Sequence, residues 1–255
     1  YGQAKSLLFS KYLKNQSTAV VNIDDPFFNH IASALKKKTA LLSYGVHPSA
    51  DFKIIDHTNT LEGVNAVISI KGTNHNIVLP LLGTHNLYNA LCALAALQAA
   101  GINISPEALN TLKPIPGRLE KAVSEHPVFV DYAHTPDALR HALNTLRSSS
   151  SPEQHLWVVF GCGGDRDKGK RPQMGKIAEE LADRIFITSD NPRSEPPDVI
   201  IQEICSGLKN PNRAVIIEDR ALAIRKAIKE RTSKTIVLIA GKGHETYQDI
   251  NGMRI

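Results

Sequence analysis

The second half of the chain alternates short apolar runs with helical segments, and this alternation limits the folds that the sequence can adopt. Parallel strands need a crossover connection of a dozen or more residues, which is usually a helix. Apolar runs typical of buried strands fall at 128–132, 156–160, 184–188, 214–217 and 235–240, with helices expected at 136–147, 172–182, 197–208 and 220–230. The pattern predicts an α/β fold with a Rossmann-like, doubly wound and mostly parallel sheet.

The first half of the chain is less regular. Strands are expected at 18–23, 39–44, 52–56, 64–70 and 77–81, and helices at 3–12 and 86–100, the second of which Gly101 ends. Ser105 is expected to cap a further helix, with Pro106 as its first residue. Residues 111–117 contain two prolines and predict a linker. We therefore expect two domains, at 1–115 and 116–255.

The composition narrows the class of protein. The 255 residues are 42% hydrophobic, but no apolar run approaches the length of a membrane span and no signal peptide is present. The net charge of +5 suits either an anionic ligand such as a nucleotide or a modestly basic surface. No Lys/Arg run is interleaved with aromatic residues, so we expect no nucleic-acid partner. The three cysteines form no CxxC pair, which favours a reducing, cytoplasmic setting.

Unusual polar residues follow four of the expected strands. Asp131 and His134 follow the first strand, a glycine-rich charged segment at 161–171 follows the second, and Gly-Lys-Gly-His-Glu at 241–245 follows the last. In open α/β sheets, ligands bind at the carboxyl ends of the strands. Because neighbouring strands lie about 5 Å apart, these loops are expected to meet around one small ligand.

The third strand is followed by Asp190-Asn191-Pro192-Arg193. This loop carries a carboxylate, an amide and a guanidinium, and a proline stiffens it. Arginine suits a carboxylate and aspartate suits an ammonium group, so the loop can hold both ends of an amino acid. A plain polar turn is the alternative, because Asn-Pro is common in turns. Together with Arg166 and Glu245, the loop predicts half of an amino-acid clamp.

The segment at 161–171 resembles a phosphate-binding loop without matching one. Gly164 is followed, after four residues, by Gly169 and Lys170, but Arg171 stands where a hydroxyl is needed to reach Mg²⁺. The four intervening residues include two carboxylates, which would repel a triphosphate. Arg166 also stands where a GxGxxG fingerprint has its third glycine. A dinucleotide-binding module therefore fits the topology but lacks its fingerprint.

Taken in order, the segments at 117–120, 131–136, 161–172, 190–193 and 241–245 resemble the Mur ligase family, and most closely its diaminopimelate-adding, E-type members. Residues 22–26 and 83–89 resemble the family's central domain more loosely. The resemblance implies that the Rossmann-like domain is preceded by the C-terminal part of a P-loop-type central ATPase domain. The family's N-terminal domain and phosphate loop are not found in this chain. We therefore expect that the chain by itself does not complete the family's reaction.

The resemblance also implies a set of binding residues for the amino acid meso-diaminopimelate. In these relatives the Asp-Asn-Pro-Arg motif recognises diaminopimelate, and further residues bind its carboxylates and an amine. The residues implied here are Asp190, Asn191, Pro192, Arg193, Arg166, Gly241 and Glu245.

A second set of residues is implied for ATP and Mg²⁺. Lys5 matches a lysine carried as a carbamate, N6-carboxylysine, whose oxygens can ligate Mg²⁺. Asn86 matches the residue placed against the adenine, and Arg118 and Asp131 match catalytic residues that contact phosphate and ribose. Without the resemblance, Lys5 is an ordinary surface lysine, Asn86 caps a helix, and Arg118 and Asp131 form salt bridges.

The implied function is ATP-dependent amide-bond formation in a monomeric protein of the bacterial cytoplasm. ATP would phosphorylate the D-glutamyl carboxylate of the UDP-N-acetylmuramoyl dipeptide, and the amine of meso-diaminopimelate would attack the acyl phosphate. Positioning and charge neutralisation would supply most of the rate. A lysine-adding sibling, a folylpolyglutamate synthase and a non-catalytic dinucleotide-binding module remain as alternatives.

Overall fold

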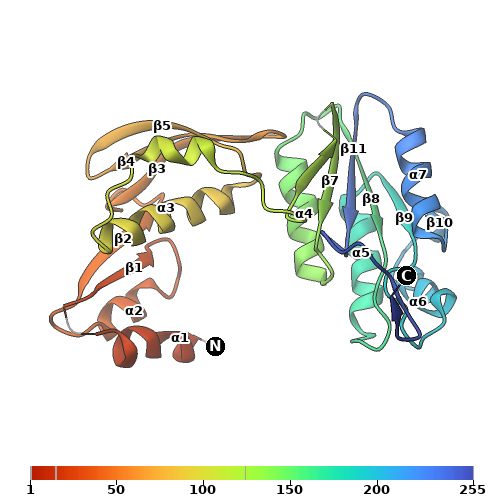
Figure 1. Ribbon diagram of the computed structural model, residues 1–255, viewed down its shortest axis with the longest axis horizontal. Helices are drawn as coiled ribbons and strands as arrows, with labels where there is room; N and C mark the ends of the chain where they lie inside the picture. Colours follow the sequence, from red (N-terminus) through yellow and green to blue (C-terminus); the bar gives the residue numbers. More distant parts are fainter. Residues whose placement is uncertain (1, 15, 124, 255) are drawn as a thin grey trace. The chain divides into compact units, whose positions relative to one another are not determined.

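The computed structural model describes residues 2–14, 16–123 and 125–254. The chain divides into two compact units, Tyr1–Lys113 (unit 1) and Pro114–Ile255 (unit 2). Both are mixed α/β structures, and each has its own sheet (Figure 1). Among the described residues, no helix has the length and apolar character needed to cross a membrane.

The sheet of unit 2 confirms the predicted parallel architecture. Its order is β10-β9-β8-β11-β7-β6, and every neighbouring pair is parallel except β6 with β7. The strands are β6 (Glu120–Val123), β7 (His126–Asp131), β8 (His155–Phe160), β9 (Arg184–Ile187), β10 (Ala214–Ile216) and β11 (Thr235–Ala240). Strand β11, the last of this sheet in chain order, lies between β7 and β8. This position brings the loops after β7, β8 and β11 together at one edge.

Helices cover both faces of this sheet. They are α4 (Pro136–Ser148), α5 (Lys170–Leu181), α6 (Pro197–Cys205) and α7 (Arg220–Glu230). Ala223 and Ala227 of α7 pack with Val159 of β8 in one apolar cluster. Side chains alternate along a strand, so the neighbouring buried residues Val158 and Phe160 face the other side of the sheet. There α5 contacts both α4 and α6.

Helices α4 and α7 begin with a side-chain N-cap. Thr135 accepts a hydrogen bond from the backbone N–H of Ala138 (3.3 Å), and α4 begins at Pro136, as expected for the helix at 136–147. Asp219 caps α7 in the same way through Leu222 (2.9 Å). After β11 the chain forms a short antiparallel hairpin, β12 (Asp249–Ile250) and β13 (Met253–Arg254).

Unit 1 has a five-stranded sheet in the order β1-β2-β3-β4-β5. The strands are β1 (Thr18–Asn22), β2 (Ala40–Gly45), β3 (Phe52–Thr60), β4 (Gly63–Ile70) and β5 (Thr73–Leu79). The first three strands are parallel neighbours, and β3, β4 and β5 form an antiparallel meander. Helix α3 (Thr84–Ala99) covers this sheet, because Leu87, Leu91 and Leu94 pack against Phe52 and Ile68.

The remaining helical segments of unit 1 differ in part from the sequence prediction. The expected helix at 3–12 is α1 (Gly2–Leu7), which continues as the π-helical turn Leu8–Tyr12. Helix α2 (Phe28–Ala34) was not predicted. Ser105 stands at the N-cap position and Pro106 at the first position, as expected, but the segment Pro106–Thr111 is a 3-10 helix and the Ser105 side chain makes no capping hydrogen bond. The Ser105 hydroxyl instead donates to the carboxylate of Glu107.

Candidate functional site

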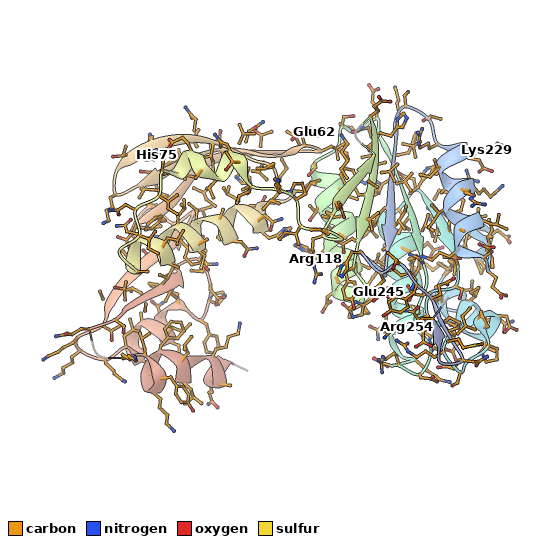
Figure 2. The ribbon with its side chains drawn as sticks, viewed as in Figure 1. Glu62, His75, Arg118, Lys229, Glu245 and Arg254 are labelled. Carbon is orange, nitrogen blue, oxygen red and sulfur yellow. The ribbon has the colours of Figure 1, made fainter. Side chains whose placement is uncertain are left out.

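A cavity of about 420 Å³ lies at the carboxyl ends of the strands of unit 2. It is lined by Tyr132, His134, Thr135, Gly163, Arg166, Asp167, Lys170, Asp190, Asn191, Arg193, Gly241 and Glu245. These residues come from the loops after β7, β8, β9 and β11, which the structure brings together (Figure 2, where Glu245 is labelled). Of the residues predicted to bind the amino acid, all except Pro192 line the cavity.

Glycines allow the loop after β8 to approach the loop after β9. The backbone N–H of Gly164 donates to the carbonyl of Asn191 at 2.9 Å. A Cβ atom added to Gly164 would lie 1.8 Å from the carbonyl oxygen of Pro192, which is closer than atoms can approach. Pro192 thus contributes its backbone carbonyl to this contact. The close approach of the two loops explains why residue 164 is glycine.

Arg193 is held in a left-handed conformation, with φ +51°. Its backbone N–H donates to the carbonyl of Asp249 (3.0 Å), and its carbonyl accepts from the N–H of Asn251 (2.9 Å). In the side chain, Nη1 donates to the carbonyl of Gly164 (2.7 Å), and Nε lies 3.7 Å from the Asp249 carboxylate. A guanidinium has five N–H donors, so Arg193 retains donors for a ligand.

Asn191 connects the loop after β9 with the loop after β11. Its Oδ1 accepts from Lys242 Nζ (2.8 Å) and from the backbone N–H of Asp249 (2.9 Å). Its Nδ2 donates to Oε2 of Glu245 (3.1 Å), and Lys242 Nζ lies 3.5 Å from the same oxygen. These contacts fix the Glu245 carboxylate at the cavity wall. Sequence reasoning singled out Gly241 and Glu245 but missed Lys242, which is buried between them.

Asp190 is buried at the base of the cavity, beside Gly241 and Arg220. Its Oδ2 lies 3.9 Å from Nη1 of Arg220, the first residue of α7. Gly241 has φ +115°, and a Cβ there would lie 2.7 Å from the same Oδ2, so only glycine fits. Arg220 was not predicted from the sequence, because the first position of a helix is ordinarily exposed.

Arg171, the residue that excluded a phosphate-binding loop, is fully buried. Its guanidinium donates to both oxygens of Glu195 (2.9 Å each), to Glu203 (2.5 Å) and to the carbonyl of Gly163 (3.1 Å). Glu195 in turn accepts from the backbone N–H of Asp165 at 2.6 Å. Arg171 therefore connects the segment after β8, which carries Arg166, to Glu195 and Glu203 through buried hydrogen bonds.

Asp131 ends β7 and joins the turn that precedes β6 to the loop that follows β7. Its two carboxylate oxygens accept hydrogen bonds from the backbone N–H groups of Leu119 and Ala133, each at 2.8 Å. Burial raises the pKa of Asp131, against the effect of these two hydrogen bonds. The guanidinium of Arg118 lies over the ring of Tyr132 at 5.4 Å (Arg118 is labelled in Figure 2). Within the described residues, the cavity lining includes Tyr132 but neither Asp131 nor Arg118.

Lys5 and Asn86 belong to unit 1. Lys5 is exposed on α1. Asn86 lies in the first turn of α3, where its Nδ2 donates to the carbonyl of Leu82 (2.8 Å) and its Oδ1 accepts from Asn89 (3.3 Å). In residues 2–14, 16–123 and 125–254, no group of three or more His, Cys, Asp or Glu side chains is arranged to hold a metal ion.

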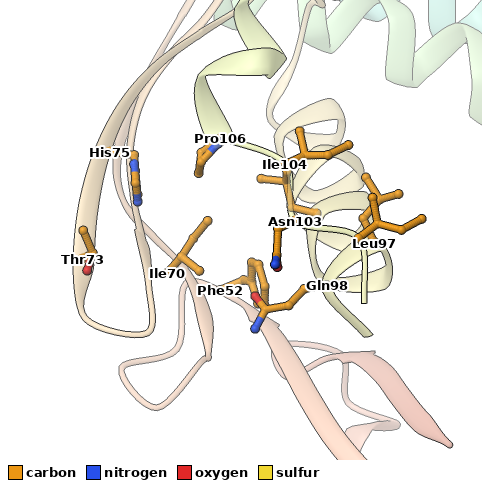
Figure 3. Close-up of a pocket in the computed structure, with 11 residues that line it drawn as sticks. Phe52, Ile70, Thr73, His75, Leu97, Gln98, Asn103, Ile104 and Pro106 are labelled. Atoms are coloured by element: carbon orange, nitrogen blue, oxygen red, sulfur yellow. The ribbon is translucent and has the colours of Figure 1, made fainter. Parts of the chain in front are cut away.

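A second cavity, of about 330 Å³, lies in unit 1 beside the C-terminal half of α3 (Figure 3). Its walls are mostly apolar and include Phe52, Ile70 and Leu97. His75 Nδ1 lies 3.0 Å from Oε1 of Glu107. The hydrogen bonds from Ser105 and His75 lower the pKa of Glu107 to about 2. The described lining of this cavity includes none of the residues predicted for ATP, Mg²⁺ or the amino acid.

Two family models match the chain. Residues 1–97 match the Mur ligase middle domain, and residues 117–243 match the glutamate ligase domain of Mur ligases. The UDP-N-acetylmuramoyl-L-alanyl-D-glutamate–2,6-diaminopimelate ligase of Neisseria meningitidis is 41% identical over 261 residues, and that of Xanthomonas campestris is 43% identical over 265 residues. Each alignment covers 100% of this chain and 52% of the relative.

A solved structure of a UDP-N-acetylmuramoyl-L-alanyl-D-glutamate–2,6-diaminopimelate ligase is similar to the whole chain. Its TM-score is 0.71 at 37% identity, and the match covers 100% of this chain and 53% of that one. The chain thus spans about half the length of the curated relatives it matches. The two matched domains and the similarity over its whole length show that the chain belongs to the Mur ligase family.

Proposed function

We propose that the chain is part of an ATP-dependent ligase that adds meso-diaminopimelate to UDP-N-acetylmuramoyl-L-alanyl-D-glutamate. The names of its relatives support this reaction. The cytoplasmic site of action, the monomeric state and the domain limits 1–115 and 116–255 belong to the same proposal. Light scattering of the purified chain tests whether it is monomeric.

The observation that carries the proposal is the charge arrangement of the unit 2 cavity. Arg166 and Arg193 line it together with the carboxylates of Asp190 and Glu245. Diaminopimelate carries an ammonium and a carboxylate at each of its two ends. Guanidinium groups bind carboxylates through paired N–H donors, and carboxylates accept from ammonium groups. The cavity therefore offers complementary partners for both kinds of charge on this amino acid.

Within this proposal, Asp190, Asn191, Pro192, Arg193, Arg166, Gly241 and Glu245 form the amino-acid site. The two arginines hold carboxylates, and Glu245, fixed by Asn191, accepts hydrogen bonds from an amine. ATP would supply the phosphoryl group that activates the glutamyl carboxylate. The neutral amine would then attack the activated carbonyl and expel phosphate. The contribution of this cavity is to hold and orient the amine.

The nucleotide part of the proposal rests on Lys5, Asn86, Arg118 and Asp131. The ammonium of an unmodified lysine cannot ligate Mg²⁺, whereas a carbamate offers two oxygens. Lys5 is exposed and thus accessible to carbon dioxide. Mass spectrometry of the intact chain at high bicarbonate, compared with Lys5→Arg, tests for the carbamate. The expectation that the chain by itself does not complete ligation stays a prediction, which ATP-dependent product formation by this chain would overturn.

Three alternatives share the fold. A lysine-adding ligase would bind an amino acid without a second carboxylate, a folylpolyglutamate synthase would bind glutamate, whose second end has a carboxylate but no amine, and a dinucleotide-binding module would bind NAD. Arg193 in the cavity wall favours the diaminopimelate ligase over the lysine-adding one, and Glu245, which can accept from an amine, favours it over the glutamate-adding one.

The test is calorimetric titration of the chain with meso-diaminopimelate. We expect saturable binding that Arg193→Ala weakens by roughly tenfold or more, because a charge-assisted hydrogen bond contributes about 1.5–3 kcal/mol. Arg140→Ala removes an arginine that pairs with Glu180 on the helical surface, and it should bind as the wild type does. Binding of NAD but not of diaminopimelate would reject the proposal.

A further inference from the structure

Two buried, oppositely charged atoms at the base of the cavity lack hydrogen-bond partners. They are Oδ2 of Asp190 and Nη1 of Arg220, which lie 3.9 Å apart. Their side chains are 10% and 8% exposed. The separation is too long for a hydrogen bond but short enough for a strong ion-pair interaction in a site shielded from water. Arg220 is therefore the cation that pairs with Asp190, and both side chains are buried.

The location of Arg220 is unfavourable for a cation unless an anion compensates it. Arg220 is the first residue of α7, where the helix dipole disfavours positive charge. Its Nη2 donates to the carbonyl of Ala240 at 2.9 Å. Burial lowers the pKa of Arg220, and the negative charges of Asp190 and Glu245 act in the opposite direction. The guanidinium is thus stabilised by Asp190 and Glu245, two of the carboxylates that line the cavity.

The other groups around Asp190 do not replace Arg220. Gln248 donates to the backbone carbonyl of Asp190, not to its carboxylate. Burial raises the pKa of the Cys162 thiol to about 12, so this neighbour on the loop after β8 is uncharged near neutral pH. Lys242, on the loop after β11, donates to Asn191 and lies 3.5 Å from Glu245. Asp190 and Glu245 therefore each have a cation beside them: Arg220 for Asp190 and Lys242 for Glu245.

We propose that Arg220 is a positioning residue that holds the Asp190 carboxylate at the cavity wall, where it receives an ammonium group of the bound amino acid. The ionic coupling between the two side chains follows from this chain's own geometry. The consequence for the ammonium group rests on the proposed function. A purely structural Arg220 would instead serve only to tie the start of α7 to the end of β11 through Ala240.

The coupling is measured without ligand, by urea unfolding of Arg220→Met, of Asp190→Asn and of the double variant. Because each side chain is the other's partner, the double variant should lose clearly less stability than the sum of the two single losses. Arg220→Lys keeps the charge and should lose less stability than Arg220→Met.

Arg225→Met is the matched control, because it removes an exposed arginine from the same helix. Its loss of stability should simply add to that of Asp190→Asn. Should Arg220→Met fail to fold, the double variant Arg220→Met/Asp190→Asn is expected to fold again, since it removes the unpaired carboxylate. Additive losses of stability, or no recovery of folding in the double variant, would overturn the inference.

Binding of meso-diaminopimelate gives a separate readout. Arg220→Met should bind roughly tenfold more weakly. Because Arg220 acts through Asp190, the double variant should bind no more weakly than Asp190→Asn alone. Additive losses of affinity would contradict the positioning role. If the wild-type chain binds no meso-diaminopimelate, the proposed function fails, while the unfolding measurements still decide the coupling.

Discussion

Replacing Arg171 by methionine removes the cation at the centre of the segment after β8. The guanidinium is fully buried and donates two hydrogen bonds to Glu195 and one to Glu203. Breaking a buried ion pair by removing one partner costs about 3–5 kcal/mol. Glu195 and Glu203 remain 13% and 34% exposed, so water can solvate part of the charge left behind. We therefore expect a loss near the lower limit, about 3 kcal/mol.

Urea and thermal unfolding of the chain measure this loss. In a domain the size of unit 2, each kcal/mol corresponds to about 3 °C, so the melting temperature of unit 2 should fall by about 10 °C. Lys176→Met is the control, because Lys176 lies on the same helix and makes only an exposed ion pair at 4.0 Å with Glu180. It should change the free energy of unfolding by less than about 0.5 kcal/mol. A loss below about 1 kcal/mol in Arg171→Met would refute the anchoring role.

The same substitution should also weaken the binding of meso-diaminopimelate. Glu195 accepts from the backbone of Asp165, and the Asp165 carboxylate accepts from the backbone and hydroxyl of Ser194. This chain of contacts joins the loop that carries Arg166 to the loop that carries Arg193. Without Arg171, both guanidinium groups lose part of their support.

Three further predictions concern the same loops. Gly164→Ala should destabilise unit 2 by about 2 kcal/mol or more in urea unfolding, because its Cβ would meet the carbonyl of Pro192. Gly169→Ala is the control: Gly169 has a φ of −61°, and its replacement should cost less than about 1 kcal/mol. Hydrogen bonds from Arg171 lower the pKa of Glu195 to about 2, so Glu195 contributes stability that is complete above about pH 4.3 and is lost as the pH falls through 2. Glu195→Gln should therefore lower the free energy of unfolding near neutral pH, and its difference from the wild type should shrink in acid; a difference independent of pH would contradict this. Lys242→Met should weaken meso-diaminopimelate binding by roughly tenfold, because Asn191 and Glu245 lose a charge-assisted hydrogen-bond partner. Unchanged affinity would show that Asn191 alone positions Glu245.

The parallel sheet of unit 2 could be predicted because its strands are short apolar runs that helices separate. The meeting of polar loops at one edge then follows from the direction of the strands. Strand β6 was missed because Glu120 and Lys121 make it an edge strand without an apolar run. Strand β5 begins at Thr73, earlier than expected, because its polar residues Thr73–Asn76 pair with β4 in a hairpin.

The supporting charges of the cavity could not be predicted in this way. Arg171, Arg220 and Lys242 are all buried, whereas a sequence pattern places arginine and lysine at the surface. Their burial depends on partners from other loops: Glu195 and Glu203 for Arg171, and Asp190 for Arg220. Such partners become visible only when the loops are placed in three dimensions.

On the proposed function, this cavity selects an amino acid with a carboxylate at each end. The direct test is the ratio of the affinities of the chain for meso-diaminopimelate and L-lysine, measured by calorimetry under one set of conditions. Lysine would leave a guanidinium without its carboxylate, a cost of about 1–3 kcal/mol, so we expect diaminopimelate to bind roughly tenfold or more tightly. In Arg193→Ala the two affinities should become similar. Equal affinity of the wild-type chain for both amino acids would contradict the account.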